Sequence, residues 1–176
     1  MGLAAGLLVA CAGEEPEDTG EVMYCGLVDD PAMEGPWMTA TNLGEELVDG
    51  ADLILECGFQ GLYMFEIHPR IGGVSSSNDY LSLNWYLDIE GRNDGPAGHF
   101  AARDFEQIFI GCPSNGGPRT IQVILDGPLD AITPLDGLPA RFYAELDTLD
   151  GPRTIDVDLT IRLFGDDDNW SWCDHE

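Results

Sequence analysis

The segment that decides the fold class of this chain is Tyr80-Leu81-Ser82-Leu83-Asn84-Trp85-Tyr86-Leu87-Asp88-Ile89. Apolar and polar side chains alternate with a period of two along it, which is the pattern of a β-strand with one buried face. The side chains expected to point into the core are Leu81, Leu83, Trp85, Leu87 and Ile89. Trp85 is therefore predicted to be a core residue rather than an exposed one.

The same alternation predicts further strands along the chain. A long strand near the C-terminus is expected to turn inward Ile155, Val157, Leu159, Ile161 and Leu163. Shorter inward sets are Ile121, Val123 and Leu125, and then Phe142, Ala144 and Leu146. Strands are also expected at about 23–28, 52–57, 62–68 and 105–110. No segment has a sustained helical period.

Turn signals separate the predicted strands. Asp-Gly-Pro occurs at 94–96, 126–128 and 150–152, where glycine supplies a positive φ and proline fixes φ of the next residue. About eight short strands between such turns predict an all-β fold, an antiparallel β-sandwich of immunoglobulin-like character, with a β-barrel as the alternative. The Cys, Trp and Tyr-x-Cys pattern of immunoglobulin domains is absent, so the strand topology stays open.

The N-terminal segment indicates where the protein works. Residues 3–10 are all apolar or glycine, too few for a transmembrane helix of about 20 residues but enough for the apolar region of a secretory signal. Leu8-Val9-Ala10-Cys11 resembles the lipobox of bacterial lipoproteins. The resemblance implies a signal peptide over 1–10, lipidation of Cys11 and a membrane anchor of acyl chains such as palmitate. Because no Lys or Arg precedes the apolar run, the true start is expected upstream.

The remaining chain divides into a tether and one domain. Residues 11–20 hold the expected lipidated cysteine and an acidic tether without large apolar side chains. Residues 21–176 are predicted to form a single β-sandwich domain, large enough to bury about 70% of its unfolded surface. The expected location is the cell envelope, as an outer-membrane lipoprotein facing the periplasm or the cell surface. A hydrophobic N-terminal strand over 1–11 is the alternative reading.

The charge of the chain restricts its partners. It has 33 acidic residues against seven arginines and no lysine, for a formal net charge of -26. Such a surface stays soluble and repels nucleic acid and anionic lipid headgroups. We therefore expect no nucleic acid as a partner, a membrane contact only through the lipid anchor, and a protein or a glycan as the ligand.

Four cysteines remain once Cys11 is assigned to lipid. In an exported chain this even number predicts two disulfides. Three pairings are possible for Cys25, Cys57, Cys112 and Cys173. We favour Cys57 with Cys112 and Cys25 with Cys173, because the second bridge would tie the two ends of the domain together. A zinc site is the alternative, although no pair has Cys-x-x-Cys spacing.

A second resemblance lies in Gly58-Phe59-Gln60-Gly61-Leu62-Tyr63. It is similar to a Gly-x-Gln-Gly-Gly-x-His element of uncharacterised acidic lipoproteins of Gram-negative bacteria. Gly58, Gln60 and Gly61 match, whereas Leu62 and Met64 replace the second glycine and the histidine. The resemblance implies an exported β domain and no activity, and the missing histidine argues against a metal at this motif.

One acidic and aromatic segment near the C-terminus is a candidate ligand site. Asp166 and Asp168 offer oxygen ligands for Ca²⁺ in one short loop, and an acidic turn is the alternative. Trp170 and Trp172 point the same way in an extended chain and would form a sugar-stacking platform, or else close the core. Together these residues predict a calcium-dependent carbohydrate-binding module as the second functional hypothesis.

No local signature of catalysis is present in the sequence. His68, His99 and His175 are isolated from one another, and no Gly-x-Ser-x-Gly element occurs. The leading hypothesis is a lipid-anchored, exported β-sandwich that acts as a non-catalytic binding or structural module, with no resident cofactor. A hydrolase with an unlocated site is the third hypothesis. A pocket that joins His68 or His99 to a carboxylate and a hydroxyl would favour it.

Overall fold

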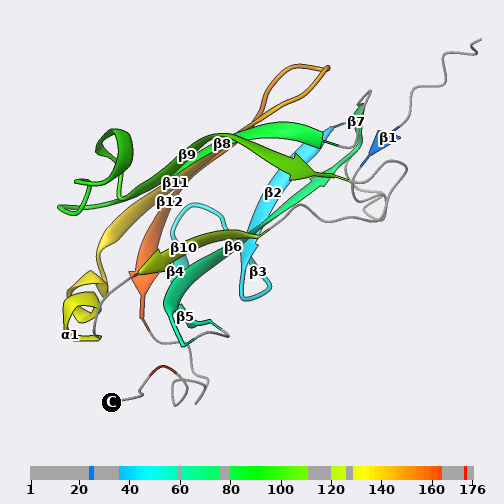
Figure 1. The fold of residues 1–176 in the computed structure, drawn as a ribbon. Helices are drawn as coiled ribbons and strands as arrows, with labels where there is room; N and C mark the ends of the chain where they lie inside the picture. Colours follow the sequence, from blue (N-terminus) through cyan, green and yellow to red (C-terminus); the bar gives the residue numbers. More distant parts are fainter. Residues whose placement is uncertain are drawn as a thin grey trace, which may run out of the picture.

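The protein is a β-sandwich in the computed structural model, which describes residues 24–25, 36–58, 61–75, 80–110, 120–125, 129–163 and 173. Two five-stranded sheets pack face to face (Figure 1). The first sheet runs in the order β10 (Ile121–Leu125), β6 (Tyr63–Gly72), β2 (Trp37–Asn42) and β3 (Glu45–Glu46), and β5 (Glu56–Cys57) also pairs with β6. The predicted all-β sandwich is confirmed, and the chain does not close into a barrel.

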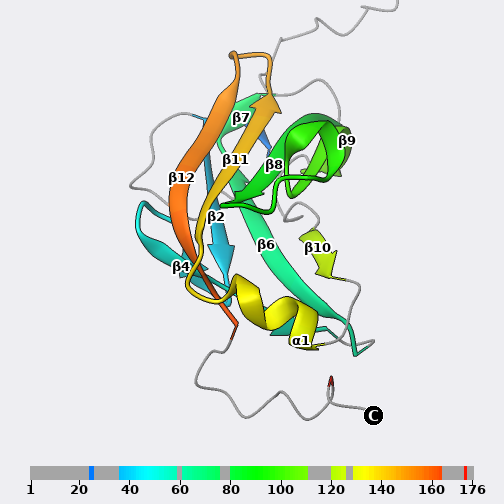
Figure 2. The same ribbon diagram turned by 90° about the vertical axis from the view of Figure 1, so that its left-hand side faces the viewer.

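The second sheet runs in the order β4 (Ala51–Ile54), β12 (Arg153–Arg162), β11 (Pro139–Asp147), β8 (Tyr80–Ile89) and β9 (Ala101–Phe109). Figure 2 shows β12, β11 and β8 in front of β2 and β6. The pairs within both sheets are antiparallel with one exception, since β4 runs parallel to β12. The second sheet is therefore mixed, which the sequence did not predict.

The remaining described elements are short. β1 (Tyr24–Cys25) pairs with β7 (Val74–Ser75) outside the two sheets. A turn of 3-10 helix, η1 (Pro96–Gly98), precedes β9. Between β10 and β11 the chain forms α1 (Leu129–Ile132) and η2 (Thr133–Leu135), which bury Ile132 and Leu135 against the core.

Burial follows the period-two pattern of the sequence. All five residues of β8 that were predicted to face inward are buried, and Trp85 is 7% exposed. The inward set of β12 is also confirmed, with Val157 only half-buried. The inward residues of β10 and β11 are buried as predicted. Side chains from both sheets form one hydrophobic cluster, which is the core of the sandwich.

The side chain of Asn42 joins the two sheets where the chain passes from β4 to β5. Its Oδ1 accepts from the N–H of Ile54 at 2.8 Å, and its Nδ2 donates to the carbonyl of Ile54 at 3.2 Å. Nδ2 also donates to the carbonyl of Glu66 in β6 at 3.0 Å. Asn42 is 2% exposed, so water cannot replace these bonds. The side-chain amide of Asn42 thus takes the place of a peptide group in a neighbouring strand. It bonds to both the N–H and the carbonyl of Ile54, the last residue of β4.

The two long sides of the sandwich therefore differ. On one side the chain crosses from β4 in the second sheet to β5 in the first, and Asn42 satisfies the backbone of that crossing. On the other side the edge strands β10 and β9 are not paired with each other. Figure 2 shows β4 beside β12 on one side of the molecule, and β9 and β10 on the other. The sandwich is thus closed along one side and open along the other.

The described disulfide corrects the pairing that we favoured from the sequence. Cys57 is bonded to Cys173, with Cα atoms 5.8 Å apart, so neither Cys57 with Cys112 nor Cys25 with Cys173 is formed. Because β4 and β12 run parallel, the chain leaves both strands at the same end of the sheet. Cys57 follows the end of β4 closely, and the segment that leads to Cys173 begins at that same end. Cys112 lies outside the described residues, as does the side chain of Cys25.

Removal of the Asn42 side chain should cost much of the domain's stability. Asn42→Ala leaves the buried N–H of Ile54 without an acceptor, and an unsatisfied buried group costs about 1–3 kcal/mol. With the other bonds of the amide, we expect the free energy of unfolding to fall by about 2–4 kcal/mol. Urea unfolding measures this value. Thr41→Ala, on the outward face of the same strand, is the matched control and should stay within about 0.5 kcal/mol of wild type. A loss equally small for Asn42→Ala would contradict the role of the amide.

Candidate functional site

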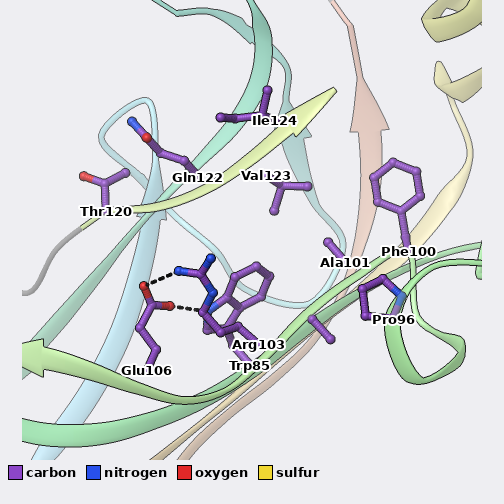
Figure 3. A pocket seen from close by; sticks show the side chains of 11 residues that line it. Trp85, Pro96, Phe100, Ala101, Arg103, Glu106, Thr120, Gln122, Val123 and Ile124 are labelled. Carbon is purple, nitrogen blue, oxygen red and sulfur yellow. Dashed lines mark hydrogen bonds and ion pairs between the residues drawn. The ribbon is translucent and has the colours of Figure 1, made fainter. Parts of the chain in front are cut away.

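A cleft of about 620 Å³ lies along the open side of the sandwich. We call it the edge cleft, and its lining includes Phe100, Arg103 and Glu106 on the β9 side, Thr120, Gln122 and Val123 on the β10 side, and Trp85 between them. Figure 3 shows Trp85, Arg103 and Val123 pointing into this space. A second cavity of about 400 Å³ shares Phe100, Val123 and Ile124 with it and continues toward α1. The open side is therefore hollowed along the whole of β10.

A hydrogen-bonded cluster of polar groups lies in the edge cleft. The indole N–H of Trp85 donates to Oε2 of Glu106 at 2.7 Å, and Arg103 donates to Oε1 at 3.2 Å. Both oxygens of Glu106 are thus engaged, as the dashed lines of Figure 3 show. The indole satisfies its one polar group at the mouth of the cleft while its rings remain in the core. These hydrogen bonds hold Trp85, Arg103 and Glu106 in place, so this wall of the edge cleft is rigid.

A second hollow, of about 390 Å³, lies on the outer face of the second sheet. We call it the aromatic hollow. It is lined by Asn84, Tyr86, Ala97, His99, Ala102, Asp104, Phe105 and Tyr143, and by part of Trp85. Tyr143, Tyr86 and Ala102 are direct cross-strand neighbours on β11, β8 and β9. The small side chain of Ala102 leaves space beside the two tyrosines, and Ala102 forms the floor of the hollow.

The rings of the aromatic hollow form a fixed stack. Tyr86 stacks on Tyr143 with centroids 4.9 Å apart, and on His99 with centroids 4.1 Å apart. Nδ1 of His99 lies 2.8 Å from Oδ1 of Asp88, so the carboxylate holds the imidazole against Tyr86. The hydroxyl of Tyr143 donates to Glu145 at 2.9 Å, and this hydrogen bond raises the pKa of Tyr143. Both faces of Tyr86 are covered, and its ring edge is left for a ligand.

Two strained backbone positions border the aromatic hollow. Phe105 has φ +54° and Ala97 also has φ +54°, a conformation that costs a residue with a side chain about 1–2 kcal/mol. Phe105 belongs to a β-bulge, since Asp104 and Phe105 together stand opposite Asn84, whose Oδ1 accepts the Phe105 N–H at 2.9 Å. The described residues contain one further strained non-glycine residue, Leu43, in the turn between β2 and β3. Strain of this kind concentrates at functional sites.

The bulge presents an exposed aromatic ring. Phe105 is 76% exposed, although a buried location is the usual one for a phenylalanine. The hydrogen bond from its N–H to Asn84 fixes the bulged backbone, so the ring is held beside the stack of Tyr86 and His99. The hollow therefore combines one accessible ring face with the amide of Asn84 and the carboxylate of Asp104.

A set of polar side chains on the outer face of the first sheet bears on the hydrolase hypothesis. It consists of His68, Thr120 and Glu66. Thr120 Oγ1 lies 3.1 Å from Nδ1 of His68, and Glu66 Oε2 lies 3.7 Å from Nε2. The second distance is too long for a hydrogen bond. His68 does not line any of the described cavities, whose residues include only Thr120 of this set. The His68 set therefore lies outside a concave site and does not favour a hydrolase, whereas His99 is bonded to Asp88 and lines the aromatic hollow with Asp104 and Tyr143, which meets the condition stated for that hypothesis.

Glu56 is a half-buried carboxyl next to that set. Burial, and then the charge of the neighbouring Glu66, together raise its pKa to about 7. Oε1 of Glu56 accepts from Nδ2 of Asn42 at 3.3 Å. The carboxyl group therefore lies where the chain crosses between the sheets. Because burial disfavours the ionised carboxylate, its negative charge destabilises the folded state there.

The structure does not describe the metal and tryptophan candidates of the sequence. Asp166, Asp168, Trp170 and Trp172 are outside the described residues, as are Cys11, His175 and the segment 1–20. Within the part of the chain that is described, no three His, Cys, Asp or Glu side chains are grouped to hold a metal ion. No described helix is long and apolar enough to cross a membrane. No sequence motif predicts the aromatic hollow, because its residues come from strands that are distant along the chain.

Comparison with known proteins offers no analogy for these sites, because no family model, curated protein or solved structure matches the chain.

The half-buried carboxyl of Glu56 predicts a pH-dependent stability. Its pKa is about 7 in the folded protein and near 4.5 when unperturbed, so between these values the folded state binds more protons than the unfolded state. The free energy of unfolding must fall as pH rises through this window. Glu56→Gln keeps the acceptor for Asn42 and removes the charge. The increase in melting temperature of Glu56→Gln over wild type should be larger at pH 8 than at pH 5.

The matched control for this experiment is Glu46→Gln in β3, where the carboxyl group is exposed. Its effect on the melting temperature should be small and should not change in this way between pH 5 and pH 8. Equal shifts for the two variants at both pH values would mean that burial of Glu56 has no energetic consequence.

Proposed function

We propose that the protein is a lipid-anchored module of the cell envelope that binds an uncharged, hydroxyl-rich ligand, a saccharide, in the aromatic hollow. The observation that carries this proposal is that backbone strain and an exposed aromatic ring occur in the same hollow. Ala97 and Phe105 both have positive φ, and both line the same hollow. A strained bulge that exposes a phenylalanine has no packing benefit, so a ligand contact is the better explanation.

The chemistry of the lining supports a neutral ligand. The carboxylates of Asp104 and Asp88 repel an anion, and Arg141 on the same face is held by two 2.6 Å hydrogen bonds to Asp156. The two faces of Tyr86 are covered by Tyr143 and His99, so this ring offers a ligand its edge. Ring edges carry partial positive charge and attract oxygen atoms. Hydroxyl groups can donate to Asp104 and accept from the amide of Asn84.

The ring of Phe105 would provide the apolar contact. One face of a sugar ring consists largely of C–H groups, and an aromatic ring supplies a large, rigid apolar surface at low entropic cost. In this proposal calcium is not required, which separates it from the calcium-dependent module expected from Asp166, Asp168, Trp170 and Trp172. A calcium site at those residues remains a separate prediction, to be tested by the effect of Ca²⁺ on the melting temperature.

The proposed location rests on the lipobox and on the cysteines. A disulfide between Cys57 and Cys173 suits an oxidising compartment. Two disulfides were expected from the four cysteines of the domain, and Cys25 and Cys112 are the two cysteines left for the second. The acidic tether over 11–20 would hold the sandwich away from the membrane to which the acyl chains of Cys11 attach it.

Substitution of Phe105 separates binding from stability. Phe105→Asn removes the ring, and asparagine tolerates a positive φ better than phenylalanine. We expect the free energy of unfolding to rise by up to about 1 kcal/mol, while affinity for a neutral oligosaccharide falls about tenfold or more. An array of neutral and acidic oligosaccharides identifies the glycan, calorimetric titration gives the affinity, and urea unfolding gives the stability.

Leu43→Asn is the matched control. Leu43 has φ +51° and is also exposed, and the change creates an Asn-Gly pair, the preferred two-residue hairpin turn. This variant should gain stability in the same way and bind the glycan as wild type does. The proposal fails if wild type binds no neutral glycan on the array, or if Phe105→Asn binds as tightly as wild type.

The anchor is tested independently by metabolic labelling with a palmitate analogue in a Gram-negative host. Wild type and a Cys25→Ala control should incorporate the label, and Cys11→Ala should not, because Cys11 is the residue of the lipobox that receives the acyl chains. Equal labelling of Cys11→Ala and wild type would show that the anchor is absent or elsewhere.

A further inference from the structure

The sheets of the sandwich end in edge strands, and most of these are protected against pairing with another chain. β3 consists of two exposed glutamates. β4 has four residues and carries Asp52, which pairs with Arg162 at 3.2 Å. β9 is long, but it contains a bulge and three charged residues, Arg103, Asp104 and Glu106. Short strands, charges and bulges are the devices that keep edges from pairing.

β10 carries neither a charge nor a bulge. Its five residues, Ile-Gln-Val-Ile-Leu, contain no charge, no proline and no glycine, in a chain of net charge -26. It pairs with β6 on one side, and no described strand pairs with its other side. Ile124 is 52% exposed on its outward face. An uncharged, unprotected edge is a template for an added strand.

The space beside this edge suits an extended chain. The edge cleft and the cavity that continues it follow β10 from Thr120 to Leu125. Figure 3 shows Val123 and Phe100 directed into this space, with Trp85 between the two banks. An added strand would lie about 4.8 Å from β10, and every second side chain would point to the same face of the sheet. Those side chains would meet the apolar surface of Val123, Phe100 and Trp85.

We propose that the free edge of β10 pairs with an extended, positively charged segment of another polypeptide, which adds a strand to the first sheet and places alternate apolar side chains in the edge cleft. Main-chain hydrogen bonds give such complexes affinity, and the pockets for alternate side chains give them selectivity. The edge of β10 is not part of the aromatic hollow, although Trp85 and Ala102 border both the edge cleft and that hollow, so it adds a protein partner to the proposed saccharide.

The charge of the chain decides between a foreign segment and a second copy. Two copies that met at β10 would each bring a net charge of -26, and this repulsion opposes association. Arg103, the cation of the β9 bank, is already paired with Glu106. Basic residues in the incoming strand would gain from the net charge of -26 of the chain.

The test uses the folded protein and a blocked synthetic peptide of alternating valine and lysine as the probe. A control peptide of equal charge has proline at two of the valine positions, which removes backbone donors and prevents strand pairing. At an ionic strength of about 0.15 M, where exposed charges are screened beyond about 8 Å, the valine–lysine peptide should bind at least about tenfold more tightly than the control. Hydrogen exchange should slow in Ile121–Leu125 and not in β9.

Two variants locate the surface. Ile124→Lys places a charge on the edge without disturbing the core, because this side chain is exposed, and it should lower the affinity for the valine–lysine peptide about tenfold or more. Leu149→Lys makes the same change of charge at a site 71% exposed in the turn between β11 and β12 and should leave the affinity within about twofold of wild type. Glycan binding should be unchanged in both variants.

Three results would overturn the proposal. The first is equal affinity for the two peptides, which would mean attraction by charge alone. The second is protection from exchange outside β10, which would place the peptide elsewhere. The third is a dimer of the free protein that Ile124→Lys dissociates, which would make a second copy of this chain the occupant of the edge.

Discussion

The structure depends on the amide of Asn42 at the point where the chain changes sheets. A crossing strand carries its N–H and C=O groups through the core, and each must be satisfied there. Asn42 bonds to both groups of Ile54 and to the carbonyl of Glu66, so one side chain from the first sheet completes the edge of the second. No apolar residue can replace it, although its neighbours Met38 and Ala40 on the same face are apolar.

This crossing makes the sandwich asymmetric, and the candidate sites follow from that asymmetry. The β4 side is closed by the crossing of the chain from β4 to β5 and by the hydrogen bonds of Asn42 to Ile54. The β9 and β10 side remains open, with the edge cleft between the two strands. The bulge of β9 turns Phe105 to the outer face, where the aromatic hollow lies. The open side thus carries the edge cleft, and the outer face of the second sheet carries the aromatic hollow.

The sequence predicted the strands whose two faces differ most and missed those whose faces differ little. β8 and β12 alternate large apolar with polar residues and were identified with their inward faces. β2 was missed because threonines face outward while alanine and asparagine are among its inward residues, so the contrast is weak. The stretch 52–57 was predicted as one strand, but it divides at Leu55 where the chain crosses. The aromatic hollow joins residues from β8, β9, β11 and η1, a proximity that only the strand pairing creates.

Exchange of the Ile54 amide hydrogen tests the central claim most directly, since this N–H donates to Asn42 Oδ1 at 2.8 Å. If the amide of Asn42 locks the crossing, Ile54 should exchange only through global unfolding, with a free energy equal to that of the most protected core amides. Exchange of Ile54 at the rate of an exposed turn amide, in a protein whose β8 amides remain protected, would contradict the account.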